Sequence, residues 1–139
     1  MVTGLGDQTD DDMADEQGGA LHFDQTIGAM PASVAAMRRH APAAYAAYLA
    51  ARESIYRDPP EGHLDRAITE LIFIVLDVVA GHEEGAKAHV EAGLKAGLTI
   101  EKITEALMIA VLINGHVHWS MTGYKVVEHA AAVAARLRG

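Results

Sequence analysis

The hydrophobic residues of this chain are mainly alanine and aliphatic side chains, and this balance limits the folds open to it. Hydrophobic residues fill 50% of the 139 positions, whereas aromatic residues fill only 5%. Alanine and leucine favour helices, while strands are rich in β-branched and aromatic side chains. A chain of this length forms one domain by default and can bury a core. We therefore predict an all-α protein, a compact bundle of about six helices.

Proline, glycine and capping residues divide the chain from Met30 onward. Pro42 suits the first turn of a helix, where the missing N–H costs nothing. Asp65 and Thr99 are typical N-cap residues, and Gly97 suits the left-handed position that ends a helix. These signals predict a loop over residues 58–62 and helices over residues 31–40, 42–57, 65–80, 82–96, 99–115 and 116–136.

The first 24 residues differ from the rest. They contain seven acidic residues and no Lys or Arg, with little to bury. We predict a disordered acidic tail over residues 1–24, either a solvated leader or a partner-binding arm, and a single helical domain over residues 25–139.

Charge and hydropathy argue against two classes of partner. Outside the acidic segment the chain has eleven basic and twelve acidic residues. It therefore has no basic stripe that would indicate binding to nucleic acid. The longest apolar run, residues 71–80, is interrupted by Asp77 and is too short to span a bilayer. The N-terminus lacks the basic start and apolar stretch of a signal peptide. We expect a cytoplasmic protein that binds neither nucleic acid nor membrane.

Three polar residues lie in or beside apolar helices. Glu70 directly precedes an apolar run, where a carboxylate must find a partner or take up a proton. His82 and His89 are seven residues apart and therefore share a helix face, with Gly85 between them. Glutamate and histidine together provide the groups for general acid–base catalysis. A purely structural alternative is that Glu70 pairs with an arginine and that backbone carbonyls satisfy the histidines.

A metal site is a second alternative. Histidine nitrogens and a glutamate oxygen are ligands for zinc and other transition metals. His116 and His118 add two imidazoles after Asn114-Gly115. At i, i+2 on a regular helix these two diverge by about 200°, so one ion could take both only where the backbone is irregular. The alternative ligand set is His82 and His89 with Glu70, His116 or His118.

The stretch from Leu64 to Gly115 resembles the carboxymuconolactone decarboxylase and alkyl hydroperoxidase D-like superfamily. The resemblance rests on an acid before an apolar helix, a helix containing His-x-x-x-Ala, and a capped helix ending in glycine. Its matching positions, with Gly93 in place of the usual alanine, are Glu70, His89, Gly93, Gly97, Thr99, Glu101, Ile103, Glu105 and Gly115. By this resemblance Glu70 is the relay glutamate and His89 the family histidine. The resemblance also implies a homo-oligomer, a trimer or hexamer.

Peroxidase members of that superfamily carry Cys-x-x-Cys before the histidine. In this chain those two positions are His82 and Gly85, and the sequence contains no cysteine. Glu84 stands where such members often have a further histidine. Thiol-dependent peroxidase chemistry is therefore excluded. The decarboxylase branch, which the resemblance implies needs neither cysteine nor cofactor, suits the chain better.

Our leading hypothesis is a cofactor-independent acid–base enzyme, a decarboxylase or a lyase/isomerase, acting on a small oxygenated and carboxylated molecule. His89 would donate or accept the proton, Glu70 would orient His89 or relay the proton, and His82 would be a second acid–base or binding group. Candidate substrate-binding groups are Arg66, Lys87 and His116, with Arg57 a further cation. The alternatives are the metal-binding enzyme described above and a non-enzymatic binding protein.

Overall fold

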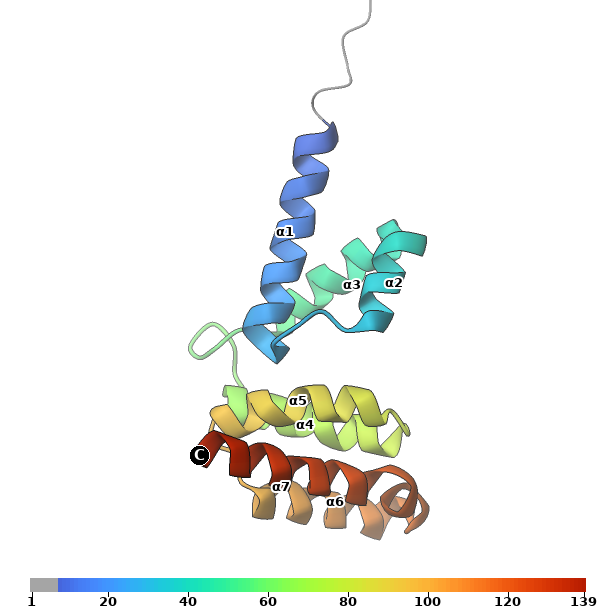
Figure 1. The fold of residues 1–139 in the computed structure, drawn as a ribbon, viewed down its shortest axis with the longest axis vertical. Helices are drawn as coiled ribbons and strands as arrows, with labels where there is room; N and C mark the ends of the chain where they lie inside the picture. Colours follow the sequence, from blue (N-terminus) through green and yellow to red (C-terminus); the bar gives the residue numbers. More distant parts are fainter. Residues whose placement is uncertain (1–7) are drawn as a thin grey trace, which may run out of the picture. The chain divides into compact units, whose positions relative to one another are not determined.

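The computed structural model describes residues 8–139, with side chains from residue 17 onward. Its elements are α1 (Gln8–Ile27), α2 (Ala32–His40), α3 (Pro42–Ile55), α4 (Arg66–Val79), α5 (Glu83–Lys95), α6 (Ile100–Asn114), a π-helical segment η1 (Trp119–Gly123) and α7 (Tyr124–Arg138) (Figure 1). No strand occurs in this described range. The all-α prediction is confirmed. Within residues 8–139 no helix is long and apolar enough to cross a membrane.

The described chain divides into two compact units, with the boundary between Ile55 and Tyr56. This differs from the prediction of one domain over residues 25–139. The first unit contains α1 to α3 and has its own small core of Phe23, Val34 and Tyr45. The second unit contains α4 to α7 and a larger core. Separate cores explain why contacts divide the chain at residue 55.

Helix α1 corrects the prediction of a disordered tail. Residues 8–24 lie within α1, and the part of the prediction that concerns residues 1–7 lies outside the described residues. Phe23 is completely buried, the Tyr48 ring stacks on it at 6.4 Å, and the Arg52 guanidinium lies 4.9 Å from its ring centre. Burial of one large aromatic side chain, Phe23, thus stabilises a helix whose composition is otherwise polar.

In the second unit, four helices pack as a bundle of two pairs. Helix α4 contacts α5 and α6, and α7 also contacts α5 and α6, so each helix has two neighbours (Figure 1). Ile74, Val78, Val90, Ile103 and Val126 are fully buried between them. Burying each such side chain contributes about 1.5–3 kcal/mol relative to leaving it exposed.

The predicted capping residues are confirmed. The Asp65 carboxylate accepts a hydrogen bond from the Ile68 amide at 3.0 Å, and the Thr99 hydroxyl accepts one from the Lys102 amide at 3.2 Å. Gly97 has a left-handed φ of 106° after α5. The predicted helix over residues 116–136 is different, because it contains η1, and regular α-helix begins only at Tyr124.

Helices α4 and α5 approach closely at Gly93. A β-carbon at this position would lie 2.6 Å from Leu98 Cδ1 and 3.4 Å from Glu70 Cβ. The missing side chain therefore leaves room for Leu98 and lets the backbone of α5 come near Glu70. A helical glycine costs roughly 1 kcal/mol relative to alanine. Close packing around a buried carboxyl group accounts for its presence.

A half-buried histidine on α7 predicts a measurable effect of pH on stability. The pKa of His129 lies below its ordinary value of 6.5, because burial penalises the charged ring and because Lys87 and Arg136 repel it. Glu84 and Glu91 oppose this effect. The unfolded chain thus binds a proton more readily at His129 than the folded chain does, and acidification below about 6.5 favours unfolding.

His129→Gln should therefore lose less unfolding free energy than the natural chain between about pH 7 and about pH 5. Urea unfolding followed by circular dichroism at each pH measures the difference. His63→Gln, which removes an exposed histidine, is the matched control. Equal pH dependence in the natural chain and His129→Gln would show that the environment of His129 does not disfavour its protonation.

Candidate active site

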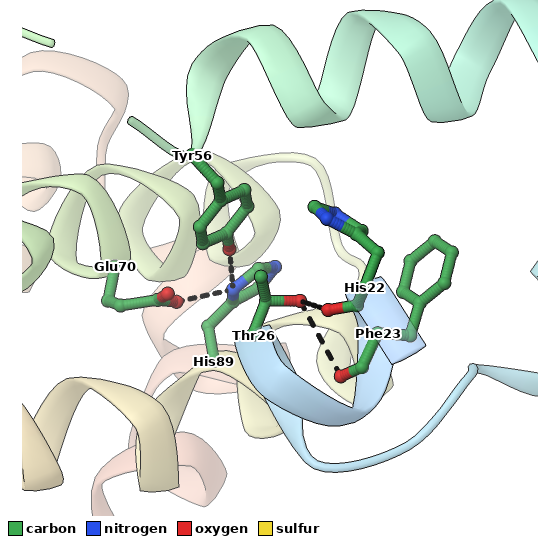
Figure 2. A network of polar contacts seen from close by, with 6 residues as sticks. All are labelled: His22, Phe23, Thr26, Tyr56, Glu70 and His89. Carbon is green, nitrogen blue, oxygen red and sulfur yellow. Dashed lines mark hydrogen bonds and ion pairs between the residues drawn. The ribbon is translucent and has the colours of Figure 1, made fainter. Parts of the chain in front are cut away.

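Glu70 and His89 form a buried pair between α4 and α5. Glu70 Oε2 lies 2.6 Å from His89 Nδ1, and Figure 2 shows the two side chains directed toward each other. The exposed fraction of the side chain is 0% for Glu70 and 6% for His89. Such a short contact between a carboxyl group and an imidazole is typical of a charge-assisted hydrogen bond. The predicted pairing of these two residues is thus present.

The second oxygen of Glu70 has a different environment. Oε1 is buried, and none of the described residues forms a hydrogen bond with it. A buried carboxyl oxygen without a partner is costly. The close contact between Oε2 and Nδ1 is therefore the hydrogen bond that offsets the burial of this carboxyl group.

Aromatic rings fix the plane of the imidazole. The Phe73 ring lies parallel to His89, with centroids 4.3 Å apart and an interplanar angle of 2°. Tyr56 stacks on Phe73 at 5.8 Å, and its hydroxyl lies 3.4 Å from His89 Nδ1 (Figure 2). The Arg66 guanidinium lies 4.6 Å from the centre of the Tyr56 ring. The imidazole is thereby held so that Nδ1 faces Glu70 and Tyr56.

Sequence reasoning missed Phe73 and Tyr56. A signal existed for Phe73, because it follows Glu70 by three positions and residues at i, i+3 share a helix face. Tyr56 belongs to the segment between α3 and α4, where no helical periodicity predicts the direction of a side chain. Arg66, predicted as a substrate-binding residue, lies beside the site through its contact with Tyr56.

His82 lies apart from the pair. Its Nδ1 is 3.3 Å from Asp77 Oδ1, and 58% of its side chain is exposed. It is the residue directly before α5, so the backbone there is not helical and the seven-residue spacing to His89 does not place both on one face. A β-carbon on Gly85 would collide with the His82 ring, which explains the glycine. Sequence reasoning placed His82 beside His89, and the structure pairs it with Asp77 instead.

The remaining predicted site residues lie in surroundings other than those of the Glu70–His89 pair. Lys87 Nζ forms an ion pair with Glu83 at 2.7 Å, which raises the pKa of Lys87 and lowers that of Glu83. His116 is exposed before η1, and His118 lines a separate pocket beside that segment. Among the contacts of residues 17–139, none joins Lys87, His116 or His118 to Glu70 or His89.

The ligand set of the metal hypothesis is not assembled in this structure. Within the part of the chain that is described, no group of three or more His, Asp or Glu side chains is arranged to hold a metal ion. His82 contacts Asp77, whereas His89 contacts Glu70. The second unit thus contains two separate histidine–carboxylate pairs, one exposed and one buried.

The conserved pattern of the carboxymuconolactone decarboxylase family matches residues 42–135, which include Glu70 and His89. The chain belongs to the carboxymuconolactone decarboxylase family. A solved structure from Burkholderia xenovorans LB400, provisionally named a carboxymuconolactone decarboxylase, is similar to it, with a TM-score of 0.84 and 26% sequence identity. The similarity covers 88% of this chain and 93% of that one. No curated protein matches the chain. Membership points to a decarboxylase-like or peroxidase-like enzyme.

The buried pair predicts strong energetic coupling. Glu70→Leu should leave His89 Nδ1 without its close partner, and His89→Leu should leave a buried carboxyl group without one. Each should lower the free energy of unfolding by about 1–3 kcal/mol. The double variant should lose clearly less than the sum of the two single losses, because no polar group is then left unpaired. Urea unfolding of all four chains measures the coupling.

The exposed pair His82 and Asp77 is the matched control. The same cycle with His82→Leu and Asp77→Leu should give a coupling of about 1 kcal/mol or less, because solvent screens the pair. Single losses at Glu70 and His89 that add to within about 0.5 kcal/mol would contradict a coupled pair.

Proposed function

We propose that this protein is a cofactor-independent acid–base enzyme, a decarboxylase or a lyase/isomerase for a small, oxygenated, carboxylated molecule. The observation that carries the proposal is the 2.6 Å contact between Glu70 Oε2 and His89 Nδ1 in a buried site. Family membership supports it, since the family is named for a decarboxylase. The sequence contains no cysteine, so a thiol-dependent peroxidase is not proposed.

In this proposal each nitrogen of His89 has a separate role. Nδ1 faces Glu70 and Tyr56, so Nε2 is the nitrogen that would exchange a proton with substrate. When Nε2 donates its proton, the proton held by Glu70 Oε2 can move to Nδ1. The imidazole then remains neutral, and the negative charge ends on Glu70. This relay lets a buried histidine give up a proton without forming an imidazolide.

The same relay runs in both directions. A neutral His89 with a proton on Nδ1 and a free Nε2 can take a proton from carbon, while Glu70 stabilises the charge that develops on the ring. Decarboxylation leaves an electron pair that a carbonyl group conjugated to the departing carboxylate can accept. His89 Nε2 would then protonate that carbon. In an isomerisation, His89 Nε2 would take a proton from one carbon and return a proton to another, without loss of carbon dioxide.

Arg66 is the cation that we propose for the substrate carboxylate. Its guanidinium lies over Tyr56, whose hydroxyl contacts His89, and no carboxylate within the described residues forms an ion pair with it. An arginine can bind a carboxylate through two parallel hydrogen bonds. Lys87, in contrast, is neutralised by Glu83. This difference favours Arg66 over Lys87 as the substrate-binding group.

The proposal predicts that His89 and Glu70 act as one catalytic unit. A panel of small carboxylated lactones and keto acids is incubated in D₂O, and carbon dioxide release and deuterium incorporation at carbon are followed by NMR. His89→Gln should reduce turnover of the responsive compound by about 10²–10⁴-fold. Glu70→Gln should also cause a large loss, and the double variant should be little worse than His89→Gln.

His129→Gln, which removes a histidine outside the pair, should keep its activity within a few-fold. Circular dichroism confirms that each variant retains its helices. If His89→Gln turned over the same compound at the natural rate, His89 would not be the proton-transfer group. If no compound of the panel reacted or exchanged, the proposed substrate class would be wrong.

A further inference from the structure

Tyr56 contacts both groups to which the proposed function gives a task. Its hydroxyl lies 3.4 Å from His89 Nδ1 (Figure 2), and the Arg66 guanidinium lies 4.6 Å from the centre of its ring. All three residues belong to the second unit, and Tyr56 and Arg66 are half-buried. One side chain thus joins the proposed carboxylate-binding group to the proposed proton-transfer group.

The Tyr56 ring lies beside the His89 ring. The Phe73 ring is nearly parallel to both, at 10° to Tyr56 and 2° to His89. If the two rings lay on opposite faces of Phe73, their planes would be roughly 7 Å apart, because stacked rings are separated by about 3.5 Å. The contact of 3.4 Å between the hydroxyl and Nδ1 excludes that arrangement. Phe73 therefore supports the plane of both rings, and the hydroxyl reaches Nδ1 from the side.

The contact with the Tyr56 ring orders Arg66 without occupying its hydrogen-bond donors. A cation over a ring face is attracted by the charge distribution of the ring, and this attraction uses none of the N–H groups of a guanidinium. Those N–H groups are the ones that bind a carboxylate through two parallel hydrogen bonds. Without the ring, the long arginine side chain would have to be ordered when substrate binds, and this ordering weakens binding. The ring therefore prepares Arg66 for a carboxylate.

The Tyr56 hydroxyl can stay in contact with His89 throughout a proton transfer. Nδ1 has its close partner in Glu70 Oε2 at 2.6 Å, and the hydroxyl is the longer contact at 3.4 Å. A phenol both donates and accepts hydrogen bonds. It can therefore donate to Nδ1 when this nitrogen is bare and accept from it when it carries a proton. A carboxylate, in contrast, only accepts. The hydroxyl thus holds the imidazole in both protonation states of Nδ1.

We propose that Tyr56 is the positioning residue of this site, with a separate task for each end of its side chain. The ring holds Arg66 ready for the substrate carboxylate, and the hydroxyl holds the His89 imidazole while the proton moves. This inference rests on the proposed function. Because one rigid side chain lies between the two groups, it also fixes their spacing, and a substrate that engages both must be a small molecule.

Two substitutions of Tyr56 separate the tasks in steady-state kinetics on the responsive compound. Tyr56→Phe keeps the ring and removes the hydroxyl, so kcat should fall about 3–10-fold while KM stays within about 2-fold. Tyr56→Leu removes both, so kcat should fall similarly and KM should also rise about 3–10-fold. A role in stability alone would not separate kcat from KM in this way.

A second measurement needs no turnover. The Arg66 Nε–H resonance is assigned by its loss in Arg66→Lys and is followed by NMR while sodium acetate is added to the full chain. Tyr56→Leu should move this resonance, because the ring current is lost, and should weaken acetate binding about 3–10-fold. Tyr56→Phe should change neither, but it should shift the His89 Nδ1 resonance. The exposed Tyr124 is the control, and Tyr124→Phe and Tyr124→Leu should leave the kinetics and both resonances unchanged.

Two results would overturn this assignment. The first is a Tyr56→Leu variant that retains its helices, by circular dichroism, and binds acetate as tightly as the natural chain does. The second is an equal change of kcat and KM in Tyr56→Phe and Tyr56→Leu, which would leave the ring without a task of its own. If no compound of the panel were turned over but acetate binding followed the predicted order, the proposed function would fail and the positioning of Arg66 by Tyr56 would stand.

Discussion

A carboxyl group completely removed from water is the constraint around which the second unit is organised. Glu70 lies within the apolar helix α4, where an unpartnered carboxyl group would oppose folding. His89 of α5 provides the partner at 2.6 Å. The contact requires α4 and α5 to lie close together and in one register, and Gly93 makes room for this approach. Phe73 then fixes the plane of the imidazole. Burial that is costly for a purely structural group is useful for one that must transfer a proton.

Much of the second unit could be predicted from the sequence, because its signals are local. Asp65 and Thr99 are N-cap residues whose side chains accept hydrogen bonds from the first turns of α4 and α6, and Gly97 follows the end of α5. The pairing of Glu70 with His89 was also predictable, from the apolar run beside Glu70 and from the resemblance to a family. Helix α1 was not predictable in this way, because its composition is polar and its stability depends on one anchor, Phe23, that meets residues distant in the sequence.

The surroundings of the histidines required the structure. Spacing alone placed His82 beside His89, but the helix begins one residue later, so His82 turns to Asp77. Tyr56 reaches His89 from an irregular segment that periodicity cannot direct. His82 and Gly85 occupy the positions where peroxidase members of the superfamily are expected to carry thiols. The chain therefore retains the glutamate–histidine pair, while an exposed histidine–aspartate pair lies at the positions where thiols are expected in those members.

The protonation of the His89 ring tests the central claim most directly. Long-range ¹H–¹⁵N NMR of histidine-labelled protein reports which ring nitrogen carries the proton. In alkaline solution the account predicts a proton on Nδ1, held by the Glu70 carboxylate, and a bare Nε2, and it predicts that this tautomer is lost in Glu70→Leu. A spectrum in which Nε2 keeps its proton while Nδ1 is bare, and which is the same in Glu70→Leu, would contradict a proton relay between Glu70 and His89.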